Sequence, residues 1–180
     1  KKYWVKEDTM RFKFPDLYFA FRRGYGNTFY PMCKERFLGV ARRDTNLYEL
    51  RTMFMAMAHD EFPAIMMTVP VVKSGDSYKL RNKLSLTIPE LKTKKFGNII
   101  YYYDPSFDFN VSNAVKLRER VKKFKQAFDI ENNDQITYFV AENMTVIAQW
   151  FGINYYEFDY SQSTSIISGR AITNSNIVIS

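Results

Sequence analysis

Alternating hydrophobic and polar residues occupy much of the chain, which is the pattern of β-strands that bury one face. Where β-branched residues are also frequent, the preference for a strand is stronger. The pattern predicts strands within residues 3–30, at 64–72, 78–88 and 97–103, and within 153–180. Turns are predicted at 24–27 and at 73–76, where glycine adopts positive φ at low cost.

Two segments combine a capping residue with apolar residues at helical spacing, so each is predicted to be a helix. The first begins at residues 45–46 and stops at Pro63. The second covers residues 135–151, with Asp134 as its cap and Gly152 as its C-terminal stop.

The clearest amphipathic helix is predicted to begin with a cap at Ser112 and to end near Phe128. Its apolar stripe, which we expect to pack on the sheet, comprises Leu117, Val121, Phe124 and Phe128. Basic residues lie on both sides of this stripe, with Lys116, Arg120 and Lys123 on one flank and Arg118, Lys122 and Lys125 on the other.

Three helices among about seven strands predict an α+β fold. We expect one compact domain over residues 1–180, in which the helices pack on a mostly antiparallel sheet. The chain has 180 residues, of which 46% are hydrophobic, and this composition is sufficient for a hydrophobic core without disulfides or metals.

Cysteine and histidine each occur once, as Cys33 and His59, which excludes an internal disulfide and the common Cys/His zinc sites. We expect no metal and no cofactor. The most apolar run, at 62–72, is far shorter than a membrane span, so none is predicted. A single cysteine also favours an intracellular, cytoplasmic location.

The net charge of +7 is distributed unevenly. Residues 1–43 hold 11 Lys and Arg against 4 Asp and Glu, and residues 111–128 hold 6 against 1. Residues 129–180 are acidic, with 6 Asp and Glu against 1 Arg. If the fold brings the two basic segments together, they form one positive surface that attracts polyanions.

This surface predicts a protein without enzymatic activity that binds nucleic acid, preferably single-stranded. Aromatic residues alternate with basic residues in the N-terminal segment, and such a mixture binds phosphates through its charges and bases through stacking. Arg23-Gly24-Tyr25-Gly26 also matches the start of the RNP1 pattern, although the match ends at Asn27. The predicted nucleic-acid-binding residues are Arg11, Lys13, Arg22, Arg23, Tyr25, Lys116, Arg120 and Lys123.

Two alternatives stay open. The abundant Tyr, Phe, Met and Arg also suit a protein interface, which indicates an assembly subunit, a homo-oligomer or an acidic protein partner. Asp76 with Glu90 and Lys92 has the spacing of a PD-(D/E)xK nuclease, in which carboxylates hold Mg²⁺. No catalytic residue is assigned. Frequent Lys, Asn, Ile, Phe and Tyr are typical of A+T-rich coding sequences, so a phage or viral origin, with a location in the host cytoplasm, is a further hypothesis.

Overall fold

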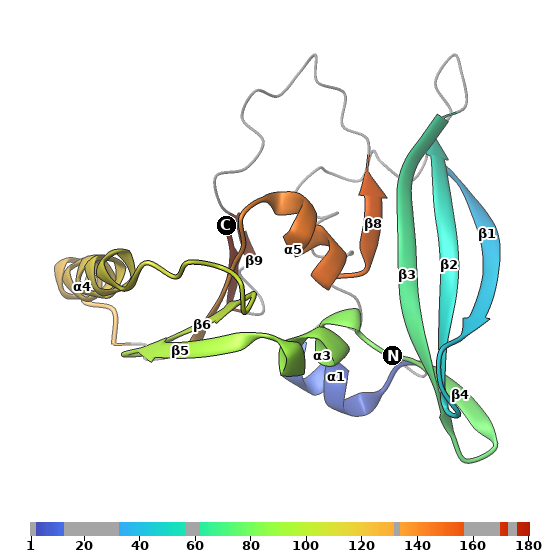
Figure 1. The fold of residues 1–180 in the computed structure, drawn as a ribbon. Coiled ribbons are helices and arrows are strands. Elements are labelled where there is room, and N and C mark those ends of the chain that lie inside the picture. The colour runs from blue at the N-terminus through green and yellow to red at the C-terminus, as the bar shows by residue number, and fades with distance from the viewer. Residues whose placement is uncertain (1–2, 13–32, 57–61, 132–133, 157–169, 173–175) are drawn as a thin grey trace. The chain divides into compact units, whose positions relative to one another are not determined.

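The computed structural model describes residues 3–12, 33–56, 62–131, 134–156, 170–172 and 176–180. These segments contain four α-helices, one 3-10 helix and ten strands, which form two five-stranded sheets (Figure 1). The α+β class predicted from the sequence is therefore confirmed, although the strands form two sheets and not one.

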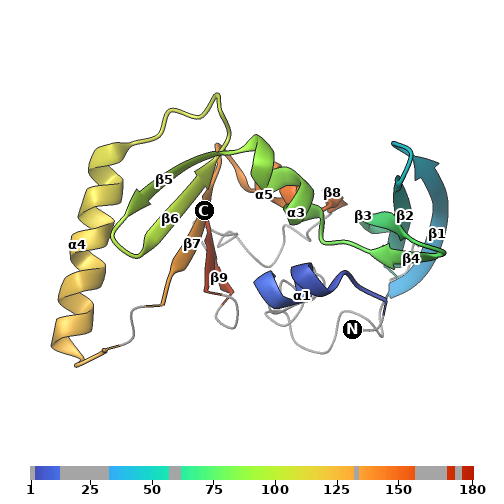
Figure 2. The same cartoon turned by 90° about the horizontal axis from the view of Figure 1, so that it is seen from below.

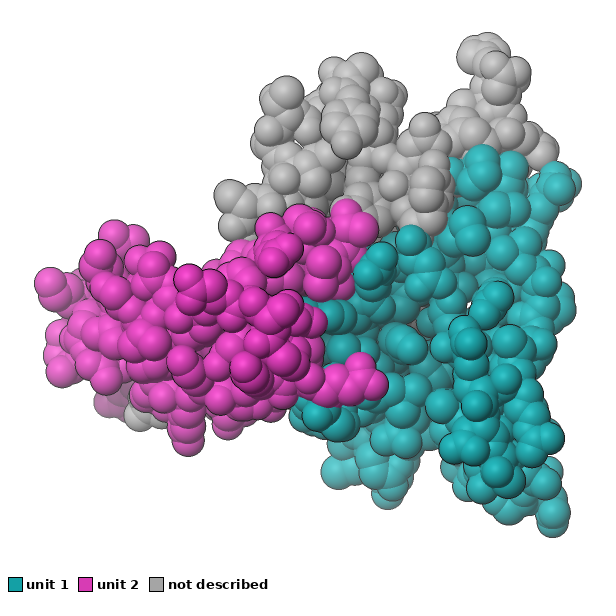
Figure 3. Space-filling view, viewed as in Figure 1, with its two compact units in different colours: residues 1–89, 148–166 teal, residues 90–147, 167–180 magenta. Residues whose placement is uncertain are grey.

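The chain divides into two compact units, coloured separately in Figure 3. Unit 1 comprises Lys1–Pro89 and Ala148–Ile166, and unit 2 comprises Glu90–Ile147 and Ile167–Ser180. This division does not test the prediction of one domain over residues 1–180, because a single domain can also contain two compact units.

The sheet of unit 1 is fully antiparallel. Its strands run in the order β1-β2-β3-β4, and a fifth strand, β8, also pairs with β3. Gly75, with φ of 60°, lies in the tight turn between β3 and β4, as the sequence predicts. The strand bounds are β1 Cys33–Arg42, β2 Leu47–Ala56, β3 Phe62–Ser74, β4 Ser77–Leu80 and β8 Ile153–Tyr156.

The helix predicted between residue 45 and Pro63 is wrong, because Leu47–Ala56 is a strand that pairs with β1 on one side and β3 on the other. Leu50 and Phe54 are four residues apart, which suits a helix, but they also lie on one face of a strand. Strand pairing decides between the helical and the extended period, because β1 and β3, which precede and follow β2 in the chain, pair with it on both sides.

Short helices precede and follow the first four strands in the chain. The helix α1, Lys6–Phe12, comes before β1, and α3, Lys83–Thr87, and the 3-10 helix η2, Ile88–Glu90, come after β4. The strand predicted at the start of residues 3–30 is wrong for Lys6–Phe12, and residues 13–30 lie outside the described part of the chain. The buried carboxylate of Asp8 joins α1 to α3, because it accepts hydrogen bonds from the backbone N–H of Asn82 (2.8 Å) and from the Ser85 hydroxyl.

The helix α5, Met144–Trp150, is followed two residues later by Gly152, whose backbone conformation requires a glycine. Gly152 has φ of 86°, and a Cβ at this position would collide with the backbone oxygen of Thr68. The Gly152 carbonyl in turn accepts a hydrogen bond from the N–H of Thr68 at 2.7 Å. The predicted C-terminal stop at Gly152 thus coincides with a close backbone contact to β3.

Unit 2 contains a mixed sheet in the order β5-β6-β7-β10-β9. β7 is parallel to both β6 and β10, whereas the remaining two pairs are antiparallel. The long helix α4, Val111–Ala127, connects the parallel strands β6 and β7. The strand bounds are β5 Lys92–Phe96, β6 Ile99–Tyr103, β7 Ile136–Val140, β9 Arg170–Ile172 and β10 Ile177–Ile179.

The helix predicted over 135–151 is correct only in its second half. Residues 136–140 form β7, in which Phe139 is completely buried, and α5 begins after this strand. The side chain of Asn143 accepts a hydrogen bond from the N–H of Val146 at 3.1 Å, so it caps α5 in place of Asp134.

We predict that Gly152→Ala lowers the free energy of unfolding by about 2 kcal/mol or more, because it adds a steric collision to the strain of positive φ. Chemical unfolding followed by circular dichroism measures this loss. Gly75→Ala is the matched control, since φ is also positive there but nothing lies within 4 Å of an added Cβ. Equal losses in the two variants would contradict the collision with Thr68.

Candidate nucleic-acid interface

The basic helix α4 has a defined start and a defined end. Asn110 is its N-cap, because the Asn110 side chain accepts a hydrogen bond from the N–H of Asn113 at 3.0 Å; the predicted cap at Ser112 is therefore wrong by two residues. At the other end, Asp129 adopts a left-handed φ of 51°, and the N–H of Ile130 bonds to the Lys125 carbonyl at 2.9 Å. This is the geometry of a Schellman motif.

The first half of α4 packs on an aromatic face of the unit 2 sheet. Ala114 is buried in this contact, and Leu117 and Val121 pack around it. The sheet side of the contact is built from β6, whose buried residues on this face are Ile99, Tyr101 and Tyr103. Figure 1 shows α4 end-on beside β5 and β6.

The second half of α4 extends past the strands on which the first half packs (Figure 2). A helix of 17 residues is about 25 Å long, whereas strands of five residues, such as β5 and β6, span about 17 Å. Phe124 and Phe128 are consequently 58% and 65% exposed, and their ring centroids lie 4.5 Å apart. The predicted apolar stripe therefore packs on the sheet only at Leu117 and Val121.

Three of the predicted binding residues, Lys116, Arg120 and Lys123, are exposed on the same flank of α4. Arg120 precedes Phe124 by one helical turn, so its guanidinium and the exposed ring belong to the same side of the helix. In the described part of the chain, none of the three forms an ion pair with a carboxylate. The sequence identified these cations but not the exposed Phe124–Phe128 pair beside them.

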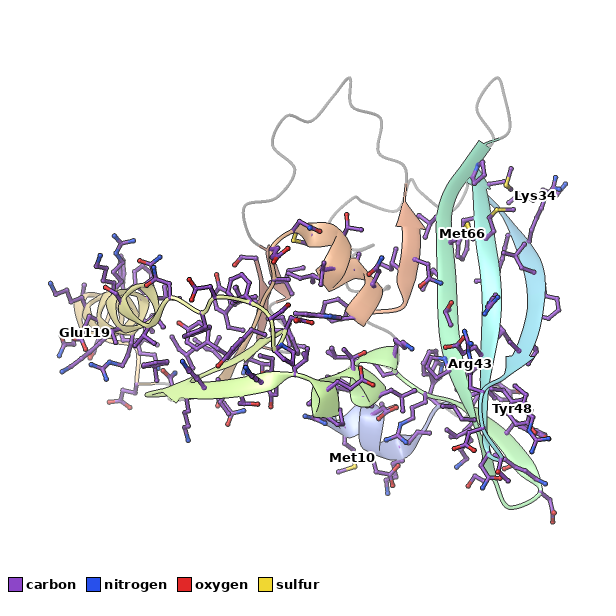
Figure 4. The ribbon with its side chains drawn as sticks, viewed as in Figure 1. Met10, Lys34, Arg43, Tyr48, Met66 and Glu119 are labelled. Atoms are coloured by element: carbon purple, nitrogen blue, oxygen red, sulfur yellow. The ribbon has the colours of Figure 1, made fainter. Side chains whose placement is uncertain are left out.

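The one acidic residue of α4 is already paired. Arg118 donates two hydrogen bonds to Glu119, at 2.6 and 3.0 Å, and this contact holds the pKa of the Glu119 carboxyl below its ordinary value. In Figure 4, Glu119 lies on the outer side of the helix. Lys122 and Lys123 also lower the pKa of Glu119, so this carboxylate offsets part of the positive charge of α4.

The remaining predicted binding residues belong to the N-terminal segment. Arg11 lies at the end of α1, where it is exposed and its guanidinium is 5.3 Å from the ring centroid of Phe12. Lys13, Arg22, Arg23 and Tyr25 lie outside the described residues. A positive surface shared by this segment and α4 stays a prediction.

Part of the basic charge in residues 1–43 is neutralised within unit 1. Arg43 pairs with Glu49 at 2.6 Å, and Arg51 and Lys83 lie 3.7 and 3.6 Å from the same carboxylate. Burial alone would raise the pKa of Glu49, but the hydrogen bond from Arg43 and the three positive charges outweigh burial and lower it. Arg43 is therefore occupied by a structural contact.

The residues of the nuclease alternative lie in unsuitable elements. Asp76 is in the exposed β3–β4 turn and Glu90 ends a 3-10 helix, whereas the nuclease motif places its carboxylates on a central strand. Within the described segments, no three His, Cys, Asp or Glu residues are grouped as metal ligands.

Comparison of this chain with models of known protein families, with curated proteins and with solved structures finds no match. No helix among the described residues is long and apolar enough to cross a membrane.

The aromatic face beneath α4 contains a buried hydroxyl group, that of Tyr101. The Tyr101 hydroxyl is buried and has no hydrogen-bond partner among the described residues. Burial, followed by the effect of Tyr138, raises the pKa of Tyr101 to about 12.

We predict that Tyr101→Phe leaves the free energy of unfolding at neutral pH unchanged or raises it by up to about 1 kcal/mol, because it removes an unpaired buried hydroxyl. Above about pH 10 the unfolded tyrosine ionises before the folded one, so wild type loses stability that the variant keeps. Urea unfolding at neutral and alkaline pH measures both effects. A variant clearly less stable than wild type at neutral pH would show that the hydroxyl has a partner.

Proposed function

We propose that the chain binds single-stranded nucleic acid through α4, by the flank that carries Lys116, Arg120 and Lys123 and by the exposed rings at its C-terminal end. The observation that carries this proposal is the exposed Phe124–Phe128 pair beside the exposed cations Lys116, Arg120 and Lys123. Aromatic rings and cations side by side form the combination that binds a single strand without reading its sequence.

In this mechanism the two kinds of side chain have separate roles. The rings stack on bases, each worth about 1–3 kcal/mol, and they accept any base because every base has a flat aromatic face. The cations neutralise phosphates and release counterions, which makes the affinity depend on salt. Arg118 contributes less, because its guanidinium is held by Glu119.

A protein partner is the second candidate. Phe124 and Phe128, together with Ile130, form an exposed apolar end of α4, and interface cores are enriched in such aromatic residues. If a protein is the partner, removal of both rings changes the oligomeric state and leaves nucleic-acid binding unaffected. The double variant Phe124→Ala, Phe128→Ala therefore distinguishes a protein partner from nucleic acid.

We predict that the triple variant Lys116→Ala, Arg120→Ala, Lys123→Ala binds a fluorescent single-stranded oligonucleotide about tenfold or more weakly, since three phosphate contacts are lost. The slope of log K against log salt becomes shallower by about 2, because each contact on a single strand contributes about 0.7. Fluorescence anisotropy at several salt concentrations measures both quantities.

The matched control for this variant is Lys73→Ala, Lys79→Ala, Lys95→Ala, which removes the same net charge from strands and leaves α4 intact. It is expected to retain nearly all of the wild-type affinity. Equal losses in the two triple variants would show that overall charge, and not α4, controls binding.

We predict that Phe124→Ala with Phe128→Ala weakens binding about thirtyfold or more while the salt slope stays the same, because stacking releases no counterions. Tyr78→Ala is the control, since Tyr78 is a similarly exposed aromatic residue on β4. Unchanged affinity in the double variant, together with a changed oligomeric state, would favour the protein partner. Shortening of the probe in Mg²⁺ would instead revive the nuclease alternative.

A further inference from the structure

β1 forms an edge of the unit 1 sheet (Figure 1). Among the described residues, β2 is the one strand hydrogen-bonded to it, and no ladder partner is described on the other side of this ten-residue strand. Its apolar side chains are also uncovered, because Phe37, Leu38 and Val40 are 65%, 47% and 57% exposed.

A β-bulge brings alternate residues from both halves of β1 to one face of the sheet. Glu35 and Phe37 lie opposite Phe54 and Thr52, and after the bulge at Leu38 the pairing resumes one residue later. Val40 and Arg42 then lie opposite Leu50 and Tyr48. Since the partners 48, 50, 52 and 54 of β2 share one face, Glu35, Phe37, Val40 and Arg42 share it as well.

We propose that this edge binds the β1 edge of a second copy of the chain, with the two strands antiparallel. The register places Glu35 of each copy opposite Arg42 of the other, and Phe37 opposite Val40. Two opposite-charge pairs then enclose two apolar pairs on a single face. The surface is distinct from α4, so this inference does not depend on nucleic-acid binding.

Charge complementarity is the reason to choose a second copy as the partner. On the face that bears Phe37 and Val40, β1 carries Glu35 near one end and Arg42 near the other, so this face complements itself when the strand is reversed. Lys34 and Arg36 lie on the opposite face. The bulge lies at the centre of this register, between Phe37 and Val40, and both strands therefore carry it at the same level.

Neighbouring groups hold these side chains in place. Glu35 accepts a hydrogen bond from the Thr52 hydroxyl at 3.0 Å, and Arg42 donates to the Asp44 carbonyl at 3.1 Å. Lys34 and Arg43, at opposite ends of β1 in Figure 4, approach each other in the paired strands. Their repulsion is reduced because Arg43 is paired with Glu49 at 2.6 Å.

Charge reversal tests the register directly. E35R alone and R42E alone each convert both opposite-charge pairs of the dimer into like-charge pairs, so each variant is expected to dimerise about tenfold or more weakly than wild type. An equal mixture of the two variants restores both opposite-charge pairs between unlike chains. Sedimentation velocity over a concentration series is expected to show dimers in the mixture and in wild type, but monomers in each variant alone.

Three results would overturn the proposal: a monomeric wild-type chain over the whole series, undiminished dimers of E35R, or a mixture that stays monomeric. D76R is the control, because it makes the same change in charge at the exposed β3–β4 turn and should dimerise like wild type. Circular dichroism checks that each variant folds. E35K replaces E35R if the larger side chain prevents folding.

Discussion

The difference in length between α4 and the strands beneath it determines what unit 2 exposes. Leu117 and Val121 are held on the aromatic face of the sheet, but the helix continues for two further turns to its Schellman end at Asp129. Over those turns none of the described strands covers the apolar side of the helix, so Phe124 and Phe128 are exposed. Burial of one half of the helix thus leaves the other half exposed.

Unit 1 presents a different kind of surface, because its sheet ends in the strand β1, which pairs with β2 alone among the described strands. Contacts at the opposite side of this sheet are tight: Gly152 lies against the backbone of Thr68, and Asp8 ties α1 to α3. β1 lacks such contacts on its outer side among the described residues. Its charges and its bulge limit unspecific pairing of the edge, while allowing the complementary register of a second β1.

Local signals made several elements predictable from the sequence. The amphipathic helix near residues 111–127, the turn at Gly75 and the strand ending at Tyr103 each depend on residues that are close in the chain. Leu47–Ala56 was not predictable in this way, because its spacing fits both a helix and a strand, and only its pairing with the adjacent strands β1 and β3 decides between them. The exposure of Phe124 was likewise not predictable from the sequence. A helical pattern shows which side of the helix is apolar, but it does not show where the sheet beneath the helix ends.

Photocrosslinking tests the role of α4 most directly. A single-stranded oligonucleotide carrying 5-iodouracil is bound to the wild-type chain at low salt and irradiated, and the attached peptide is identified by mass spectrometry. We expect the crosslinks to fall on Phe124 or Phe128. Crosslinks confined to other segments, or no crosslink under conditions in which the oligonucleotide is bound, would contradict it.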